Sequence, residues 1–380
     1  MSGEILNYTL RLTVLGPLFI GRGEQLQKSE YIFDRKVNKL YVMDKLKMFE
    51  ALNRKKLVNK FTDSIMDASA GKYAFDLFSF CRDNGIMTQE FSKWARYSFD
   101  MPKNSDLRRT QIMTFVKDAY ECPYVPGSSV KGALRNAVLN SELISSDNYM
   151  DIAQRVSRAE FRKRNNYLSR EASEIDIRAF HTLNRLKERP NNAVNSIFSG
   201  LRIGDSKPLG LNCLTLCQKV DILPDGTERK LPLQRECLAP GTVIELPVEI
   251  DTSVFPYTAE ELCRCIEKMY GNENKVFLSK FPKAPVPNGS LIYVGGGSGF
   301  VSKTAVYSLY KNPSEALDRA AEILDKTDSM LRKNDGSKVK VGNHLRDPKR
   351  YHVSPHMRKQ TVYNGKRYDF GLCRAEFEII

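Results

Sequence analysis

The 380-residue sequence contains no apolar run that approaches the ~20 residues needed to cross a membrane. Its opening residues, Met1 to Glu4, lack the basic segment and apolar core of a secretory signal. Eight cysteines are scattered along the chain and do not form the dense framework of a small disulfide-bonded domain. These absences predict a cytoplasmic protein with reduced thiols and no membrane partner.

Zinc-binding patterns are lacking among the cysteines. Cys213 and Cys217 lie in a strand-like run without the paired knuckles of a zinc ribbon. Cys263 and Cys265 fall in a predicted helix, where side chains two residues apart point in different directions. We interpret all of them as core thiols.

Metal-binding histidine patterns and nucleotide-binding loops are scarce too. His352 and His356 have the spacing of two ligands on one helix face, but Pro355 disfavours a regular helix between them. The glycine-rich run 295–299 lacks the Lys and Ser or Thr that follow the last glycine of a nucleotide-hydrolysing loop. The sequence therefore predicts neither a bound metal nor a cofactor.

Positive charge is present in excess. Lys and Arg number 59 against 45 Asp and Glu, which gives a net charge of +14 and a pI near 9.3. This excess favours a polyanionic partner, because each neutralised phosphate releases condensed counterions. Hydrophobic residues make up 41% of the chain, enough for a large core, and the length allows two domains or one with insertions.

The charge is concentrated in two segments. Residues 151–190 fit either a solvated helical arm or a basic surface that touches RNA. From Arg332 to Arg367 the chain carries eleven Lys and Arg against two acids, with Tyr351 and Tyr363 interleaved. Basic residues hold phosphates and aromatic rings stack on bases, so this second segment fits a single-stranded RNA site as well as a solvated loop.

The stretch 126–135, PGSSVKGALR, reads as an anion-binding helix start. Ser128 or Ser129 is expected to cap the first N–H groups of the helix. Lys131 and Arg135 lie four residues apart and share one helix face, where they could hold backbone phosphates. A capped amphipathic helix with two solvated charges is the alternative interpretation.

As a literal string, PGSSVKGALR resembles the helix-start motif of the RAMP superfamily, the RNA-binding subunits of CRISPR effector complexes. Four other segments resemble the same family: a turn after the first strand (Leu15 to Glu24), a mid-chain strand (Leu201 to Ser206), a glycine-rich loop (Val294 to Phe300) and a closing segment (Ser354 to Cys373). The closing segment narrows the resemblance to the subunit that caps type III-A complexes.

The resemblance implies a non-catalytic RNA-binding subunit that caps the guide RNA at its 3′ end. It implies the guide RNA and neighbouring RAMP subunits as partners, and a part in guide 3′-end maturation through the positioning of host nucleases. Two other functions stay open: a RAMP-type endoribonuclease that processes guide precursors, and a structural end cap with little RNA contact.

Nucleases related to this family use an early histidine or an aspartate in the loop after the first strand. Here the first histidine is His181, and the loop 21–27 has Glu24 as its only acid. These departures favour a protein that is not an enzyme.

The expected fold class is α+β. The segments 31–34 and 39–42 predict a hairpin around Asn38, and Thr258 with Glu261 predicts a capping box that opens a helix. Around the insertions the order strand, helix, strand, strand, helix, strand emerges and closes with the strand Ser290 to Val294, as in a ferredoxin-like, RRM-type domain. We expect an N-terminal RAMP domain over 1–200, with a helical insertion around 45–120. A C-terminal RAMP-like domain over 201–380, with the glycine-rich loop 295–299, would form a second, degenerate unit.

Candidate RNA-binding residues come from the helix start, the first turn and the glycine-rich loop. Glycine N–H groups can form an anion nest, although a tight structural turn is the alternative. Phe300 could stack on a base and Lys303 lies close by. The full set is Arg22, Gly127, Ser128, Ser129, Lys131, Arg135, Gly295, Gly296, Gly297, Gly299, Phe300 and Lys303.

Overall fold

The structure, a computed structural model, describes residues 4–102, 111–161, 163–282, 287–327, 330–332, 338–340 and 343–380. The helices are α1 (Lys45–Arg54), α2 (Val58–Ser69), α3 (Leu77–Asp83), α4 (Phe91–Trp94), α5 (Gly127–Ser145), α6 (Met150–Arg158), α7 (Ser169–Phe180), α8 (Ala259–Val276), α9 (Val306–Leu309), α10 (Pro313–Thr327) and α11 (Asp347–Tyr351). Short 3₁₀ turns include η7 (Val301–Lys303) and η8 (His344–Arg346).

The strands are β1 (Ile5–Val14), β2 (Gly21–Leu26), β3 (Tyr31–Asp34), β4 (Lys39–Met43), β5 (Ala95–Asp100), β6 (Gln111–Phe115), β7 (Leu201–Ile203), β8 (Leu214–Ile222), β9 (Glu228–Leu238), β10 (Val243–Asp251), β11 (Ser290–Tyr293), β12 (Met330–Arg332), β13 (Lys338–Lys340), β14 (Arg358–Tyr363), β15 (Lys366–Asp369) and β16 (Leu372–Ile379). Mixed helix and sheet confirm the predicted α+β class.

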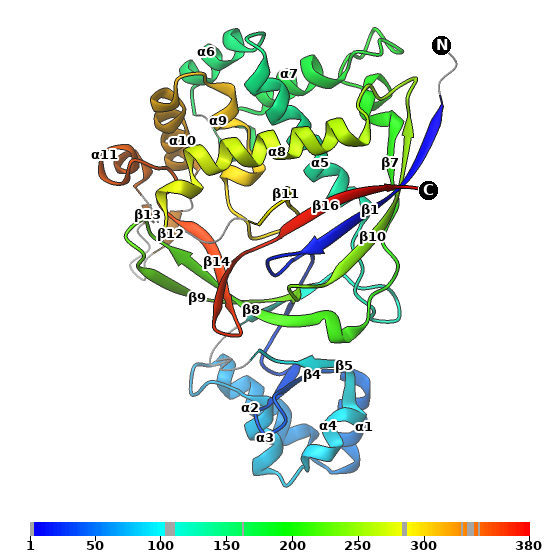
Figure 1. The fold of residues 1–380 in the computed structure, drawn as a ribbon. Coiled ribbons are helices and arrows are strands. Elements are labelled where there is room, and N and C mark those ends of the chain that lie inside the picture. Colours follow the sequence, from blue (N-terminus) through cyan, green and yellow to red (C-terminus); the bar gives the residue numbers. More distant parts are fainter. Residues whose placement is uncertain are drawn as a thin grey trace.

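A five-stranded antiparallel sheet, ordered β11-β16-β1-β10-β7, lies at the centre of the molecule (Figure 1). Alternate residues of β1 are buried, and Leu10 pairs with Leu246 of β10. Helices α5 and α8 lie along this sheet and share its core. Val130 and Leu134 of α5 are buried there, because a spacing of four residues places both side chains on the same face of the helix.

The last strand of the central sheet differs from the prediction. The segment expected to close the strand–helix order, Ser290 to Val294, forms the edge strand β11. The C-terminal strand β16 lies next to β1 instead, with Leu12 opposite Ala375. The paired residues of β1 and β16 are more than 350 positions apart, and such distant pairing leaves no local signal. The sequence therefore could not reveal that β16 lies between β1 and β11.

A six-stranded sheet, ordered β15-β14-β8-β9-β6-β2, packs below the central one in Figure 1. Both sheets take strands from 1–200 and from 201–380. The division at residue 200 therefore does not separate the sheets, and the two-domain description stays a prediction.

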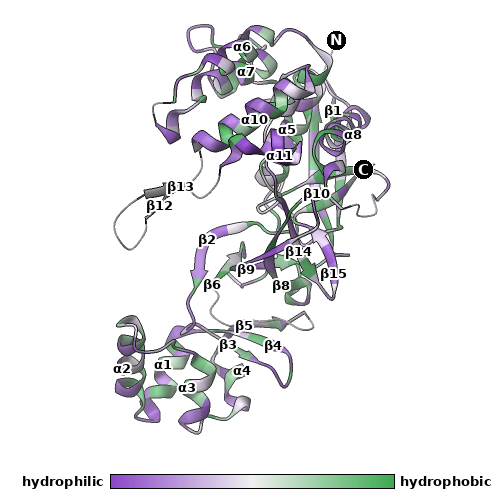
Figure 2. Cartoon of the chain, turned by 90° about the vertical axis from the view of Figure 1, so that its left-hand side faces the viewer, coloured by the Kyte–Doolittle hydropathy of each residue, from purple (hydrophilic) through white to green (hydrophobic). Residues whose placement is uncertain are grey.

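Residues 31–100 form a lobe at one end of the molecule (Figures 1 and 2). Its three-stranded sheet β3-β4-β5 carries α1–α4 on one face. Leu40 and Val42 face the main core, whereas Met43 and Trp94 belong to the lobe's own core. The expected helical insertion around 45–120 is thus helical only to Trp94, after which the chain forms β5 and β6.

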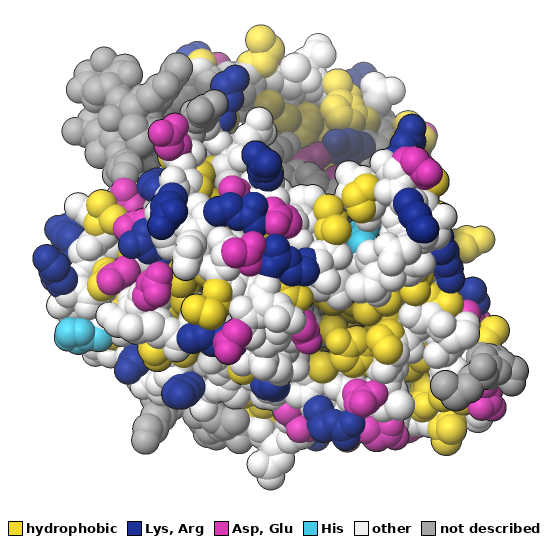
Figure 3. Space-filling model, turned by 90° about the horizontal axis from the view of Figure 1, so that it is seen from above, with side chains coloured by type: hydrophobic (Ala, Val, Ile, Leu, Met, Phe, Trp, Pro, Cys, Tyr) yellow, Lys and Arg dark blue, Asp and Glu magenta, His cyan; other side chains and the backbone are white. Residues whose placement is uncertain are grey.

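Helices α6, α7, α9 and α10 pack around a second core on the far side of α5 and α8. On this face Lys and Arg are interspersed with Asp and Glu (Figure 3). Arg155 pairs with Glu174 at 2.8 Å, and Arg178 with Asp151 at 2.7 Å. This pairing favours the solvated-arm interpretation for α6 and α7. Among the described residues, no helix is long and apolar enough to span a membrane.

Candidate functional site

Three of the five segments that carry the family resemblance, namely the first turn, the glycine-rich loop and the closing segment, are joined by backbone hydrogen bonds. The Gly296 N–H donates to the Phe19 carbonyl at 2.6 Å, which joins the glycine-rich loop to the first turn. Gly371 of the closing segment links both, because its N–H donates to the Pro17 carbonyl at 2.9 Å and its carbonyl accepts from the Val294 N–H at 2.8 Å. Residues more than 350 positions apart therefore form one backbone cluster.

The helix start is hydrogen-bonded to the mid-chain strand, which lies at the opposite edge of the central sheet from β11. The Gly127 N–H donates to Asp205 Oδ1 at 2.8 Å, and the Val125 N–H donates to Ser206 Oγ at 2.9 Å. A Cβ on Gly127 would lie 2.2 Å from the Ile203 carbonyl oxygen, so this position has no room for a side chain.

The predicted serine cap is wrong. Helix α5 begins at Gly127, and neither Ser128 nor Ser129 accepts a capping hydrogen bond. The carboxylate of Asp205, distant in sequence, accepts from the first N–H instead. Ser128 is exposed and Ser129 is half-buried, so both hydroxyls remain beside the helix start.

A polar pocket of about 470 Å³ lies between α5 and the glycine-rich loop. It brings together four of the predicted residues: Ser129, Gly295, Gly296 and Lys303. The other lining residues are Ile20, Gly21, Gly132, Ala133, Asn136, Tyr293 and Ser302. Small residues dominate, so a ligand can approach the backbone closely.

The glycine-rich loop needs its glycines for shape. Gly295, Gly297 and Gly299 have φ values of +71°, +103° and +110°, which side-chain-bearing residues rarely adopt. Next to them the hydroxyls of Ser298 and Ser302 are buried without a hydrogen-bond partner among the described residues. Such groups usually find a partner, and a bound anion would supply one.

A cluster of cations flanks the loop, and of its members the candidate set from the sequence contained only Lys303. The other three, Lys219, Arg235 and Lys359, are half-buried. Arg235 comes within reach of Gly297, since a Cβ there would lie 2.9 Å from its Nη1. Its Nε and Nη1 have no hydrogen-bond partner in the part of the chain described. Burial, together with the charge of Arg235, lowers the pKa of Lys303. Lys219 and Lys359 complete the cluster, in which Lys359 pairs with Asp221 at 2.9 Å.

Arg135 points to a structural partner. Its guanidinium donates to both carboxylate oxygens of Asp176, at 2.6 and 2.7 Å, and lies 4.3 Å from the ring centroid of Phe180. For Lys131 no such partner lies among the described residues, and burial, followed by the charges of Arg135 and Arg202, lowers the pKa of its ammonium group. Of the two helix cations, Lys131 is therefore the one available to a ligand.

The remaining predicted residues lie at the edges of the site. Arg22 is on β2 and pairs with Glu24. Phe300 is half-buried against the second core, and Gly299 lies beside the Lys359 side chain. RNA contact by any of these residues stays a prediction. Part of the basic segment from Arg332 to Arg367 lies outside the described residues.

Lys219 gives the cluster a pH dependence. Burial, with the charges of Lys359 and Arg235, lowers its pKa to about 8. Lys219 should therefore lose its charge as pH rises through 8. We expect RNA affinity at fixed salt to fall between pH 7 and 9, with the salt slope dropping by up to ~0.7 if one phosphate contact is lost.

Filter-binding titrations at both pH values measure this effect. Lys219→Met removes the titrating group, so its affinity should change less over the same interval. Equal pH dependence in the two proteins would rule out Lys219 as the source. Protein stability should change in the opposite direction. The pKa of Lys219 is about 8 in the folded protein and 10.5 in the unfolded chain, so the unfolded chain binds more protons between these values. The free energy of unfolding should therefore rise as pH increases from about 8 to 10.5.

The sequence is similar to curated proteins over most of its length. It is 29% identical over 331 residues to the CRISPR system Cms protein Csm5 of Streptococcus thermophilus, with 84% of each chain covered. It is 27% identical over 396 residues to the protein of the same name from Mycobacterium tuberculosis (strain H37Rv), with 98% of each covered. The Csm5 protein of Enterococcus italicus is 27% identical over 411 residues, again with 98% of each covered.

Solved structures share the fold. A chain in a cryo-EM structure of a type III-A Csm–crRNA–target RNA ternary complex matches with a TM-score of 0.61 at 18% identity, covering 97% of this chain and 100% of that chain. The crystal structure of T. onnurineus Csm5 matches with a TM-score of 0.58 at 18% identity, covering 96% and 99%. The family model of the RAMP superfamily matches residues 11–379, and the chain therefore belongs to the RAMP superfamily.

Proposed function

We propose that this chain is a Csm5-type RNA-binding subunit of a type III-A effector complex and that it binds the 3′ part of the guide RNA. The observation that carries the proposal is that three family segments, namely the first turn, the start of α5 and the glycine-rich loop, line one polar pocket beside half-buried cations. Similarity to Csm5 proteins along nearly the whole chain supports membership of the complex. Placement at the guide 3′ end, and the positioning of host nucleases there, follow from the same resemblance.

The pocket suits an RNA backbone. Lys303 is exposed at its wall, and α5 contributes the half-buried hydroxyl of Ser129. Lysine, hydroxyl and backbone N–H groups bind phosphate oxygens without reading the base. We infer binding that is largely independent of sequence, as a subunit that serves many different guides requires.

We also infer that the sheet behind the pocket is the ferredoxin-like unit of the superfamily. Strands β1, β7, β10 and β16 with helices α5 and α8 supply the strand–helix order of that unit. The six-stranded sheet would then be the degenerate second unit.

Catalysis is not part of the proposal. Among the described residues, neither a histidine nor a carboxylate lines the pocket. His181 is engaged on both sides, with Nδ1 2.9 Å from the Pro190 carbonyl and Nε2 3.4 Å from Asp176. A general base needs a free nitrogen within hydrogen-bond reach of its substrate.

The test combines Lys303→Gln, at the pocket wall, with Lys131→Gln, on α5 outside the pocket lining, and measures guide binding by the purified protein at several salt concentrations. Two lost phosphate contacts should lower the slope of log affinity against log salt by ~1.4 and the affinity by about tenfold at 0.15 M salt. The effect should be similar for unrelated guide sequences, because phosphates carry no sequence information.

Lys60→Gln with Lys93→Gln is the matched control. Both residues are exposed on the lobe, in α2 and α4, and the net charge changes equally. Affinity and slope should then stay close to those of the unchanged protein. Equal losses in the two double variants would show a general charge effect and refute an RNA site formed by the pocket and the start of α5.

A further inference from the structure

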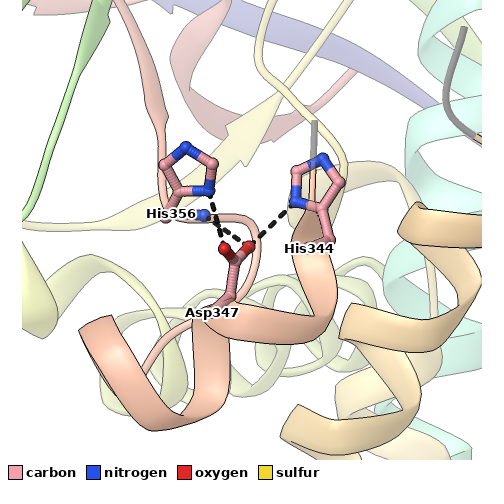
Figure 4. A group of neighbouring side chains, drawn as sticks. All are labelled: His344, Asp347 and His356. Atoms are coloured by element: carbon pink, nitrogen blue, oxygen red, sulfur yellow. Dashed lines mark hydrogen bonds and ion pairs between the residues drawn. The ribbon is translucent and has the colours of Figure 1, made fainter. Parts of the chain in front are cut away.

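One buried side-chain cluster is not used by the RNA interface. His344 begins η8, Asp347 begins α11, and His356 lies two residues before β14 (Figure 4). Each residue offers one possible ligand atom, an imidazole nitrogen or a carboxylate oxygen, and these three atoms lie within 4.8 Å of one another. The sequence did not reveal this cluster, because the histidine pair with a ligand-like spacing was His352 and His356. In the structure His352 is exposed and is not part of the cluster.

Both rings present the same nitrogen to one carboxylate. His344 Nδ1 lies 2.8 Å from Asp347 Oδ2, and His356 Nδ1 lies 2.8 Å from Asp347 Oδ1. Figure 4 shows both Nδ1 atoms turned toward the carboxylate and both Nε2 atoms turned away from it. Neither Nε2 has a hydrogen-bond partner among the described residues, so moving the ring protons from Nδ1 to Nε2 breaks no other contact.

We propose that His344, Asp347 and His356 form a zinc site. Two imidazole nitrogens and a carboxylate are a donor set that Zn²⁺ uses in proteins. Ligands ~2.0–2.1 Å from a tetrahedral zinc lie about 3.3 Å apart, so each nitrogen–oxygen pair, which is 2.8 Å apart here, would open by about 0.5 Å to admit the ion. Zinc binding would take the place of the two ring protons at Nδ1, with both protons held on Nε2, and a water molecule would supply the fourth ligand.

The surroundings hold the donors in place. The carboxylate of Asp347 is 1% exposed and also accepts from Ser354 Oγ at 3.2 Å. The Tyr351 ring stacks on His356 with centroids 5.0 Å apart. Tyr307 of α9 donates to the Ser354 carbonyl at 2.6 Å. A bound zinc would thus fix the segment that leads into β14, the strand that carries Lys359 of the cation cluster.

The experiment uses the full chain with an affinity tag free of histidine. After chelator treatment and desalting, Zn²⁺ is added, the excess is removed and bound zinc is measured by mass spectrometry. We expect one zinc per chain and an upward shift of Tm on zinc addition. His344→Ala and His356→Ala should each weaken zinc binding by more than about tenfold. His352→Ala removes an exposed histidine nearby and should bind zinc like the unchanged protein.

Co²⁺ substitution separates this site from the thiols and needs no variant. Cobalt at His344, Asp347 and His356 should give the visible bands of a tetrahedral nitrogen–oxygen site without a thiolate charge-transfer band. The proposal would be overturned if the unchanged protein retained no zinc, or if zinc binding survived the loss of either histidine. The three residues would then be a hydrogen-bonded structural cluster only. His356→Gln serves where the alanine variant does not fold.

Discussion

Glu236→Gln should lower the free energy of unfolding by about 3–5 kcal/mol, because it leaves a buried lysine without its counter-charge. The side chains of Lys117 and Glu236 are 1% and 0% exposed and form an ion pair. Glu236 also accepts from the Tyr97 hydroxyl at 2.6 Å and from the Phe115 N–H at 2.9 Å. The pair thus joins the lobe to the six-stranded sheet, and urea unfolding of the purified protein measures its loss.

Glu249→Gln is the control for this variant. Glu249 pairs with Arg202 on the surface, where the side chains are 48% and 59% exposed, so the expected loss is below about 1 kcal/mol. Combining Glu236→Leu with Lys117→Met should restore much of the stability, since an apolar pair leaves no charge unpaired. Similar small losses for Glu236→Gln and Glu249→Gln would contradict the role given to the buried pair.

Gly295→Ala should destabilise the fold by about 2–6 kcal/mol. Its φ of +71° imposes left-handed strain of about 1–3 kcal/mol on any other residue. The new Cβ would also lie 2.2 Å from the Phe19 carbonyl oxygen, and such overpacking adds about 1–3 kcal/mol. Thermal and urea unfolding measure the effect.

Gly241→Ala separates the two causes. Gly241 has a φ of +91°, but a Cβ there would meet nothing within 4 Å. Its loss should therefore be that of backbone strain alone. If both alanine variants lose the same stability, the close contact between the glycine-rich loop and the first turn is not the reason why position 295 requires glycine.

The sequence revealed elements that depend on local chemistry. The capping box at Thr258 and Glu261 forms as predicted and opens α8. The hairpin around Asn38 forms with that residue in the left-handed region at φ 52°. In both cases the interacting residues lie within a few positions of one another, so a short window of sequence holds the whole interaction.

Contacts between residues far apart in the sequence could not be predicted from it. Asp205 caps α5 from 78 residues away, so the nearby serines were the only visible candidates. Arg135 appeared free because its partner, Asp176, is 41 residues distant. Lys219 lies on β8 and Arg235 on β9, and only the antiparallel pairing of these two strands brings the residues together beside the loop.

Photo-cross-linking of the guide RNA in the assembled complex, with mass spectrometry of the linked peptides, tests the central claim most directly. We predict that nucleotides from the 3′ part of the guide link to peptides from the first turn (15–24), the start of α5 (126–135) and the loop through Lys303 (294–303), which meet at the pocket. Links confined to the lobe helices or to the charge-paired face of α6 and α7, or links from 5′ nucleotides alone, would contradict it.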